Sequence, residues 1–169
     1  MTRIQQVEAP EQITAVQTLL RDYMTWSETL ATNNRQAPTF ANWDQEFAAL
    51  PGIYGPPRGR LLLATHEGVP AGCVALKPHD ADVCELKRLY VSPDFRGHDI
   101  GRLLVTSLVR EARELGYRRM VLDSHVAMKQ AHRLYESVGF ERVETPADFP
   151  EALKPIVVFM ELPLERARV

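Results

Sequence analysis

The sequence has few cysteines, no long apolar run and no excess of charge of one sign. Its 169 residues include two cysteines, Cys73 and Cys84, too few for a disulfide framework and at no zinc-site spacing. The longest apolar runs, such as Leu61 to Ala64 and Ile156 to Met160, are far shorter than the ~20 residues of a membrane-spanning helix. These features argue against a disulfide scaffold and a transmembrane protein.

The charge balance and the N-terminus exclude further classes. With 20 lysines and arginines against 22 acidic residues, the formal net charge is -2, so no overall field attracts nucleic acid or anionic membrane. We therefore expect neither as a partner. The N-terminal Met1 to Gln6 lacks the apolar segment of a secretory signal, and a cytoplasmic location is expected.

Metal and nucleotide motifs are missing as well. The histidines form no pair at i, i+4 and cluster with no cysteine, so no metal site is expected. Neither a P-loop nor a dinucleotide-binding G-x-G-x-x-G occurs. The two cysteines are expected to be small buried hydrophobic residues rather than catalytic thiols.

What remains is the composition of an ordinary globular protein, 45% hydrophobic and 25% charged, of a length typical of one domain over residues 1–169. Apolar periodicity predicts a helix from Pro10 to about Ala31 and a shorter one from Phe40 to Leu50, which Pro51-Gly52 ends. Later helices are predicted at about 99–115 and 128–138. Strands are predicted at 2–8, 61–66, 72–77, 82–91, 120–122, 140–144 and 156–162. This order predicts a mixed α/β fold that begins as an antiparallel meander, and an exposed last strand would permit a homodimer.

The stretch from Leu89 to Leu104 combines a strand end, a loop with glycines and a helix start. Exposed N–H groups at a helix N-terminus suit a phosphate or pyrophosphate, and Arg96 and Arg102 add positive charge. The alternative is that Gly97 and Gly101 serve only a tight turn and close helix packing.

A second segment, A-H-R-L-Y-E-S-V-G-F at 131–140, follows one strand and one helix later. Together with L-Y-V-x-P, R-G-x-x-I-G and a helix ending in Gly-Tyr, it resembles the GNAT superfamily of acyl-CoA-dependent N-acyltransferases over about residues 84–140. The resemblance implies a mostly antiparallel sheet of about seven strands, splayed in the middle, with about four helices. It also implies transfer of an acetyl group from the co-substrate acetyl-CoA to an amine by direct attack.

The resemblance further implies roles for single residues. The strand that carries Leu89, Tyr90 and Val91 would splay from the next strand and bind the pantetheine arm with its backbone. Amides of the following loop would hold the pyrophosphate, and Tyr135 would protonate the departing thiolate. The implied acetyl-CoA-binding residues are Leu89, Tyr90, Val91, Arg96, Gly97, His98, Asp99, Ile100, Gly101, Arg102 and Met128.

Glu85 is the candidate general base. Regular strand alternation places its side chain on the same face as Leu89 and Val91. The alternative is a solvated carboxylate paired with Lys87 or Arg88. For Tyr135 the alternative is an ordinary core aromatic residue.

Two positions depart from the family pattern. Asp99 replaces the first glycine of the loop, and Met128 replaces an asparagine. A carboxylate near a pyrophosphate repels it unless it turns away, and Arg96, Arg102, Arg58 or Arg60 could offset that charge. These departures favour an alternative function, a non-catalytic acyl-CoA-binding or regulatory module.

The acceptor is expected to be a small-molecule or peptide amine. By position in the family plan, Trp26, Trp43 and Tyr54 are candidates for the wall of its pocket. Acylation of protein N-termini or lysines would instead favour an open acidic groove.

Overall fold

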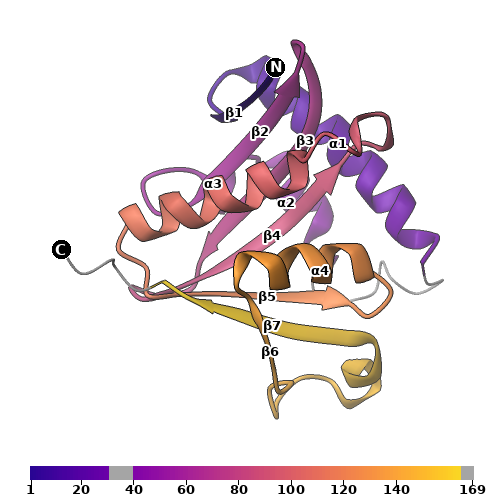
Figure 1. Cartoon of the computed structure of the whole chain (residues 1–169), viewed down its shortest axis with the longest axis vertical. Helices are drawn as coiled ribbons and strands as arrows, with labels where there is room; N and C mark the ends of the chain where they lie inside the picture. Colours follow the sequence, from indigo (N-terminus) through magenta and orange to yellow (C-terminus); the bar gives the residue numbers. More distant parts are fainter. Residues whose placement is uncertain (31–39, 165–169) are drawn as a thin grey trace.

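The computed structural model describes residues 1–30 and 40–164, which form one mixed sheet (Figure 1). The strands are β1 (Thr2–Gln6), β2 (Arg60–His66), β3 (Val69–Pro78), β4 (Val83–Val91), β5 (Arg119–His125), β6 (Glu141–Val143) and β7 (Val157–Pro163). Their order across the sheet is β1-β2-β3-β4-β5-β7-β6. Neighbouring strands are antiparallel except for β4 and β5, which are parallel. The expected seven-stranded, mostly antiparallel sheet is confirmed.

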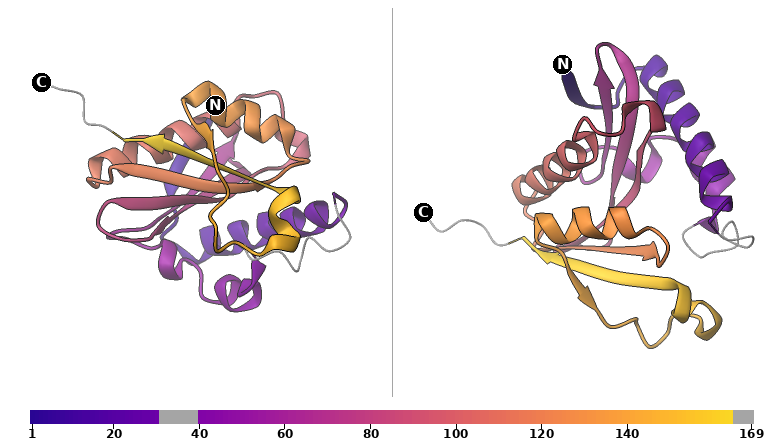
Figure 2. Two further views of the ribbon diagram at one scale, coloured as in Figure 1. Left: turned by 90° about the horizontal axis from the view of Figure 1, so that it is seen from below. Right: turned by 45° about the vertical axis from the view of Figure 1, so that its right-hand side comes forward.

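Within the described residues, four α-helices cover the two faces of the sheet (Figures 1 and 2). Helices α1 (Pro10–Glu28) and α2 (Trp43–Ala48) cover one face, and α3 (Ile100–Glu114) and α4 (Lys129–Val138) cover the other. Short 3-10 helices occur at Gly52–Tyr54, Pro93–Phe95 and Glu151–Ile156. No described helix is both long and apolar enough to cross a bilayer.

Two predicted helices are shorter than expected. Helix α1 ends at Glu28, and position 31, where its end was predicted, lies outside the described residues. Helix α2 is confined to Trp43–Ala48, although the apolar stripe runs from Phe40 to Leu50. Phe40 and Leu50 lie in turns on either side of the helix, and both side chains are buried. The apolar stripe is therefore longer than the helix, because it includes buried residues of these turns.

The prediction of an exposed last strand is wrong. Strand β7 pairs with β5 on one side and with β6 on the other, so β6 rather than β7 is the edge strand. The long connection between β6 and β7 allows β7 to insert between β5 and β6. The order of the strands along the sequence does not reveal this arrangement.

The core lies in two layers, one on each face of the sheet. Leu86, Leu104 and Leu108 belong to the layer beneath α3 and α4, whereas Leu20 and Leu61 belong to the layer beneath α1 and α2. The two cysteines are buried free thiols, one in each layer. Burial raises the pKa of both thiols to about 12, so they stay protonated and act as small hydrophobic residues.

Candidate active site

The site begins where β4 and β5 separate. Their parallel ladder consists of three pairs, in which Val83, Cys84 and Glu85 face Arg119, Met120 and Val121. Both strands are described in full, and beyond Glu85 no residue of β4 pairs with β5. Figure 1 shows the two strands diverging from that point. The expected splay is present, and it leaves the edge of β4 at Leu89 to Val91 open toward β5.

A β-bulge changes which way the side chains of β4 point. The register shifts by one residue between the pair Ala75–Lys87 and the pair Cys73–Tyr90, and Arg88 takes a left-handed φ of 61°. An extra residue in one strand reverses the alternation beyond it.

The reversal overturns the predicted shared face of Glu85, Leu89 and Val91. Leu86 lies in the core layer beneath α3 and α4, so its neighbour Glu85 points to the opposite face. Beyond the bulge, Leu89 and Val91 pack against the layer beneath α3 and α4, and Tyr90 packs beneath α1. Side chains before and after the bulge therefore serve different faces.

The Arg88 side chain is buried in a network with α2. Its guanidinium donates hydrogen bonds to Glu46, with Nε 2.7 Å from Oε2 and Nη2 3.0 Å from Oε1. The guanidinium carbon lies 5.3 Å from the ring centre of Phe40 and 5.0 Å from that of Trp43. The Tyr54 hydroxyl donates to the same carboxylate at 2.7 Å. The predicted alternative pairing of Arg88 with Glu85 is therefore wrong.

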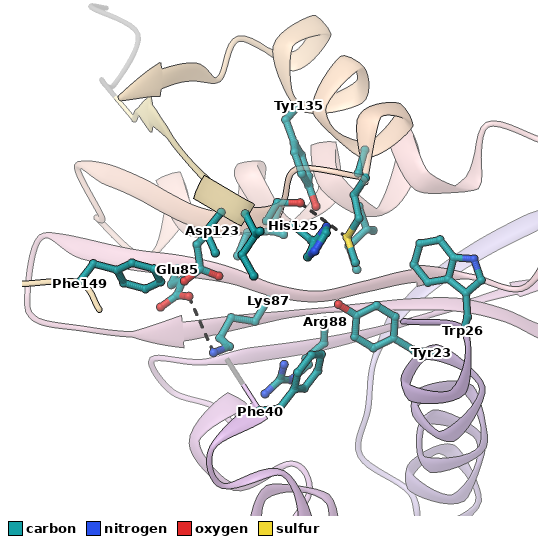
Figure 3. Close-up of a pocket in the computed structure, with 17 residues that line it drawn as sticks. Tyr23, Trp26, Phe40, Glu85, Lys87, Arg88, Asp123, His125, Tyr135 and Phe149 are labelled. Carbon is teal, nitrogen blue, oxygen red and sulfur yellow. Dashed lines mark hydrogen bonds and ion pairs between the residues drawn. The ribbon is translucent and has the colours of Figure 1, made fainter. Parts of the chain in front are cut away.

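A cavity of about 110 Å³ fills the opening between the diverging strands (Figure 3). Its walls come from α1, β4, β5, α4 and the segment before β7. The residues that line it are Tyr23, Trp26, Phe40, Glu85, Leu86, Lys87, Arg88, Leu89, Asp123, Ser124, His125, Met128, Ala131, Tyr135, Phe149, Ile156 and Val157. The two residues predicted to carry the chemistry, Tyr135 and Glu85, line the same cavity although they come from different elements.

Tyr135 reaches into this cavity from α4 (Figure 3). Its side chain is buried, and its ring centre lies 5.7 Å from that of Phe140. Burial raises the pKa of the phenol, and the charges of Tyr23 and Asp123 add to the effect. The hydroxyl is therefore protonated at neutral pH, which is the state a proton donor needs.

Glu85 is 9% exposed, so it is not a solvated surface residue. Its Oε1 lies 2.6 Å from Nε2 of His79, at the end of the β3–β4 hairpin. Its Oε2 lies 3.9 Å from Nζ of Lys87, so the predicted pairing with Lys87 is present as a long contact. These partners hold the carboxylate at the wall of the cavity.

Asp123 is a cavity residue that the sequence analysis missed. It lies on β5, two residues beyond Val121, which faces Glu85 in the last pair of the ladder. Burial raises the pKa of Asp123, and the charge of Glu85 raises it further. The sequence signal that could have identified Asp123 is its position, an acidic residue directly after the apolar run Met120-Val121-Leu122.

Of the three residues predicted for the acceptor wall, Trp26 lines this cavity, whereas Trp43 and Tyr54 do not. Tyr54 is fully buried, because its hydroxyl is held by Glu46 beneath the sheet. Tyr23, Phe40 and Phe149 supply the other aromatic surfaces of the cavity.

The loop between β4 and α3 has the backbone of an anion site. Gly97 and Asp99 have left-handed φ values of 91° and 61°, and α3 begins at the next residue, Ile100. The first N–H groups of a helix have no partner within it, and alternating handedness before them forms an anion-binding concavity. The Ile100 side chain is in the core, so its contribution to the loop is its backbone.

The turn and packing roles weighed as the alternative are both present, the turn at Gly97 and the packing at Gly101. A Cβ on Gly101 would lie 3.2 Å from Cδ2 of Leu134 on α4, so a side chain there would press on the neighbouring helix. Packing and anion binding are compatible. Close packing requires that Gly101 has no side chain, whereas anion binding would involve its backbone N–H group.

The charged side chains of the loop are partly engaged. The exposed Asp99 carboxylate lies 3.6 Å from Nε of Arg102, and Arg102 also donates to Ser137 at 2.7 Å. Arg96 donates to the Val91 carbonyl and lies over the ring of Trp26 at 5.7 Å. His98 stacks beside His66 with ring centres 4.5 Å apart.

Arg58 and Arg60 cannot offset the charge of Asp99, contrary to expectation. Arg58 donates to the carbonyl of Leu115, and Arg60 pairs with Glu111 at 3.2 Å. Both partners lie near the C-terminal end of α3, whereas Asp99 precedes its start, at least ~15 Å away at 1.5 Å per residue.

Comparisons with known proteins agree with this architecture. The model of the acetyltransferase (GNAT) family matches residues 15–140. An uncharacterized N-acetyltransferase of Schizosaccharomyces pombe is 42% identical over 130 residues, covering 76% of this chain and 78% of that protein. A crystal structure of an acetyltransferase from Streptococcus agalactiae has a TM-score of 0.73 at 22% identity, covering 96% of this chain and 98% of its own. The PaiA N-acetyltransferase of Thermoplasma acidophilum, in complex with coenzyme A, has a TM-score of 0.72 at 17% identity, covering 96% and 99%.

The family model spans the open edge of β4, the loop before α3 and the tyrosine of α4 in one match. The fold, the splayed strands and this match lead to one assignment. The chain belongs to the GNAT family of acetyltransferases.

Proposed function

We propose that this protein transfers the acetyl group of acetyl-CoA to a primary amine by direct attack, with Tyr135 as general acid and Glu85 as general base. One observation carries the proposal. Where β4 leaves β5, a single cavity is lined by a protonated phenol from α4 and by a carboxylate from β4. Proton transfers to and from the reacting atoms need a donor and an acceptor within reach of those atoms.

The residues present fit acetyl-CoA, which would supply the activated acetyl thioester. The edge of β4 that faces β5 has no strand partner from Leu89 to Val91, so backbone groups on that edge could bind the amides of a pantetheine arm. The N–H groups from Gly97 to Arg102 suit a pyrophosphate. The coenzyme A complex of the Thermoplasma acidophilum relative supports this assignment. Met128, at the start of α4, lines the cavity and would contact the arm through its side chain.

The proton balance gives each residue one task. Glu85 would take a proton from the acceptor ammonium, so that the neutral amine can attack the thioester carbonyl. As the C–N bond forms and the C–S bond breaks, Tyr135 would give its proton to the departing thiolate. The nitrogen loses a second proton, which restores Tyr135, and one net proton is released to solvent. No covalent acyl-enzyme is needed.

Asp99 and Met128 depart from the family pattern and are the reason to weigh a second candidate, a binding or regulatory module that does not turn over. Asp99 places a negative charge at the helix start, where the pyrophosphate would lie. Its carboxylate is exposed and beside Arg102, which supports the enzyme over the module because the charge is turned toward a cation.

Calorimetric titration with acetyl-CoA and with CoA, followed by an amine-dependent thiol-release assay, tests the proposal. We expect micromolar binding of both ligands and thiol release that depends on the amine, above the rate of thioester hydrolysis. Binding without thiol release over a broad amine panel would favour the module. No binding at millimolar ligand would overturn both functions.

Changing Asp99 to asparagine is expected to tighten acetyl-CoA binding about two- to five-fold, since one charge at a helix terminus contributes about 0.3–1 kcal/mol. Asparagine tolerates the left-handed conformation that Asp99 adopts, so this variant removes the charge and keeps the backbone. Titration at low and high salt provides the measurement, and the gain should shrink at high salt.

Asp99→Ala is the matched control, because it also removes the charge but strains the left-handed backbone. We expect it to bind more weakly than Asp99→Asn. Weaker binding by Asp99→Asn than by the wild type would show that the carboxylate assists the ligand.

A further inference from the structure

Glu85 must lose the proton that it takes from the acceptor before it can act again. This residue is only 9% exposed, and it lines the cavity that acetyl-CoA and the amine would fill. While both substrates are bound, water has little access to the carboxylate from the cavity side. The net proton of the reaction therefore needs a second way to solvent.

His79 lies between the Glu85 carboxylate and the outer surface. Its Nε2 is 2.6 Å from Oε1 of Glu85, the short distance of a hydrogen bond to a charged group. His79 is not among the residues that line the cavity, and its side chain is 41% exposed, against 12% for that of Glu85. The ring therefore joins a carboxylate in the cavity wall to the surface outside the cavity.

The turn between β3 and β4 fixes the backbone that carries this ring. The N–H groups of His79 and Asp80 both donate to the Val83 carbonyl, at 3.0 and 3.2 Å. The Asp80 carboxylate accepts in turn from the N–H groups of Asp82 and Val83, each at 2.8 Å. His79 is thus held at a defined place opposite the start of β4 and within reach of Glu85.

The other charged groups around Glu85 do not offer the same path. Nζ of Lys87, on the same strand, lies 3.9 Å from Oε2, beyond hydrogen-bond distance. Lys77 faces Glu85 across the β3–β4 pair, and Asp123 lines the cavity itself. Within residues 1–30 and 40–164, Nε2 of His79 is the one side-chain atom at hydrogen-bond distance from the Glu85 carboxylate.

An imidazole ring is suited to carry a proton between two surroundings. Its neutral form has one nitrogen that accepts a proton and one that donates, so a proton can enter at one side and leave at the other. Imidazole is also a stronger base than a carboxylate. A proton therefore passes favourably from a carboxyl group to a neighbouring histidine.

We infer that His79 is a positioning residue that carries to solvent the proton which Glu85 takes from the acceptor. The inference rests on the proposed function and adds the exit of its net proton. The proton on Oε1 of Glu85 moves to Nε2 of His79, and the ring then loses the proton on Nδ1 to water. Glu85 is again a carboxylate and His79 again neutral, and proton exchange with water restores the starting tautomer.

The His79→Gln variant tests the relay, because glutamine keeps a hydrogen-bond donor for Glu85 and cannot take up a proton. The readout is formation of the acetylated product from acetyl-CoA and the fastest amine of the panel. We expect kcat to fall about ten-fold, less than the 10²- to 10⁴-fold typical of a group that acts on the reacting atoms. The KM for acetyl-CoA should not change. Asp82→Asn is the matched control, because Asp82 is an exposed carboxylate of the same turn, and its kcat should equal that of the wild type.

Two further measurements separate a relay from a structural role. Free imidazole should restore the kcat of His79→Ala as its concentration rises and leave that of the wild type unchanged. Only the acetylated amine is measured, so acetyl transfer to imidazole itself is not counted. Because His79 acts through Glu85, adding His79→Gln to a Glu85→Gln variant should cause no further loss.

Three results would overturn the inference and leave the proposed function standing. The first is a His79→Gln variant with the wild-type kcat, since the hydrogen bond alone would then suffice. The second is a His79→Ala variant that imidazole does not restore, and the third is a full further loss in the double variant. A wild-type protein that acetylates no amine would instead overturn the proposed function, and this inference with it.

Discussion

Replacing Tyr135 with phenylalanine is expected to lower kcat roughly 10²- to 10⁴-fold, the range typical of general acid–base catalysis. The change removes one hydroxyl and keeps the ring that packs against Phe140. Because the proposed acyl-donor site consists mainly of backbone groups of β4 and of the loop before α3, the KM for acetyl-CoA should change little. Steady-state thiol release and thermal unfolding of both proteins provide the measurement.

Tyr117→Phe is the matched control for that experiment. Tyr117 is also a buried tyrosine, but its hydroxyl donates to the Arg58 carbonyl at 2.8 Å, away from the cavity. Its loss should cost about 1 kcal/mol of stability and leave kcat unchanged. If the Tyr135→Phe protein had the wild-type kcat, the general acid role would be refuted. Tyr135 would then be an ordinary aromatic residue of the core.

Replacing Glu46 with alanine is expected to lower the free energy of unfolding by about 3–5 kcal/mol, as removal of one partner from a buried ion pair does. Arg88 is 5% exposed, so its guanidinium cannot turn to solvent when it loses this carboxylate. The Tyr54 hydroxyl loses its acceptor in the same variant. Urea unfolding provides the measurement, with Glu111→Ala as control, because the Arg60–Glu111 pair is more exposed and should contribute less.

The pH dependence of the free energy of unfolding provides a second test of the Glu46–Arg88 ion pair. Burial raises the pKa of Glu46, but the hydrogen bond and charge of Arg88 outweigh it and lower the pKa below its usual value. A carboxyl group with a depressed pKa in the folded state stabilises the protein above its unfolded pKa. That stability is lost as the pH falls through the folded value. The stability difference between wild type and Glu46→Ala should therefore shrink in acid, and a difference independent of pH would argue against the ion pair.

Local patterns were sufficient for the order of the elements and insufficient for the geometry of the site. The helical stripes of α1 and α3 and the apolar run of β2 are short-range signals, so local patterns predict these elements. The resemblance in turn placed the open strand edge, the loop and Tyr135 on the correct elements. The position of β7 between β5 and β6 depends on long-range pairing, which no local pattern encodes.

The errors in the candidate site have a common cause. The left-handed conformation of Arg88 is not a preference of arginine, so regular alternation was assumed through β4 and gave Glu85 the wrong face. Arg88, at the bulge, donates hydrogen bonds to Glu46, and Glu46 also accepts a hydrogen bond from the Tyr54 hydroxyl. These buried contacts hold the Tyr54 side chain beneath the sheet, so it does not line the cavity between β4 and β5.

The three-pair ladder between β4 and β5 also divides the sheet into two half-sheets. Strands β1 to β4 form one half, and β5, β7 and β6 form the other. Glu85 belongs to the first half, and Tyr135, on the helix that follows β5, belongs to the second. The core layer beneath α3 and α4 contains residues of both halves, such as Leu86 and Met160. The alignment of the proposed acid and base therefore depends on the packing of that layer as well as on three backbone pairs.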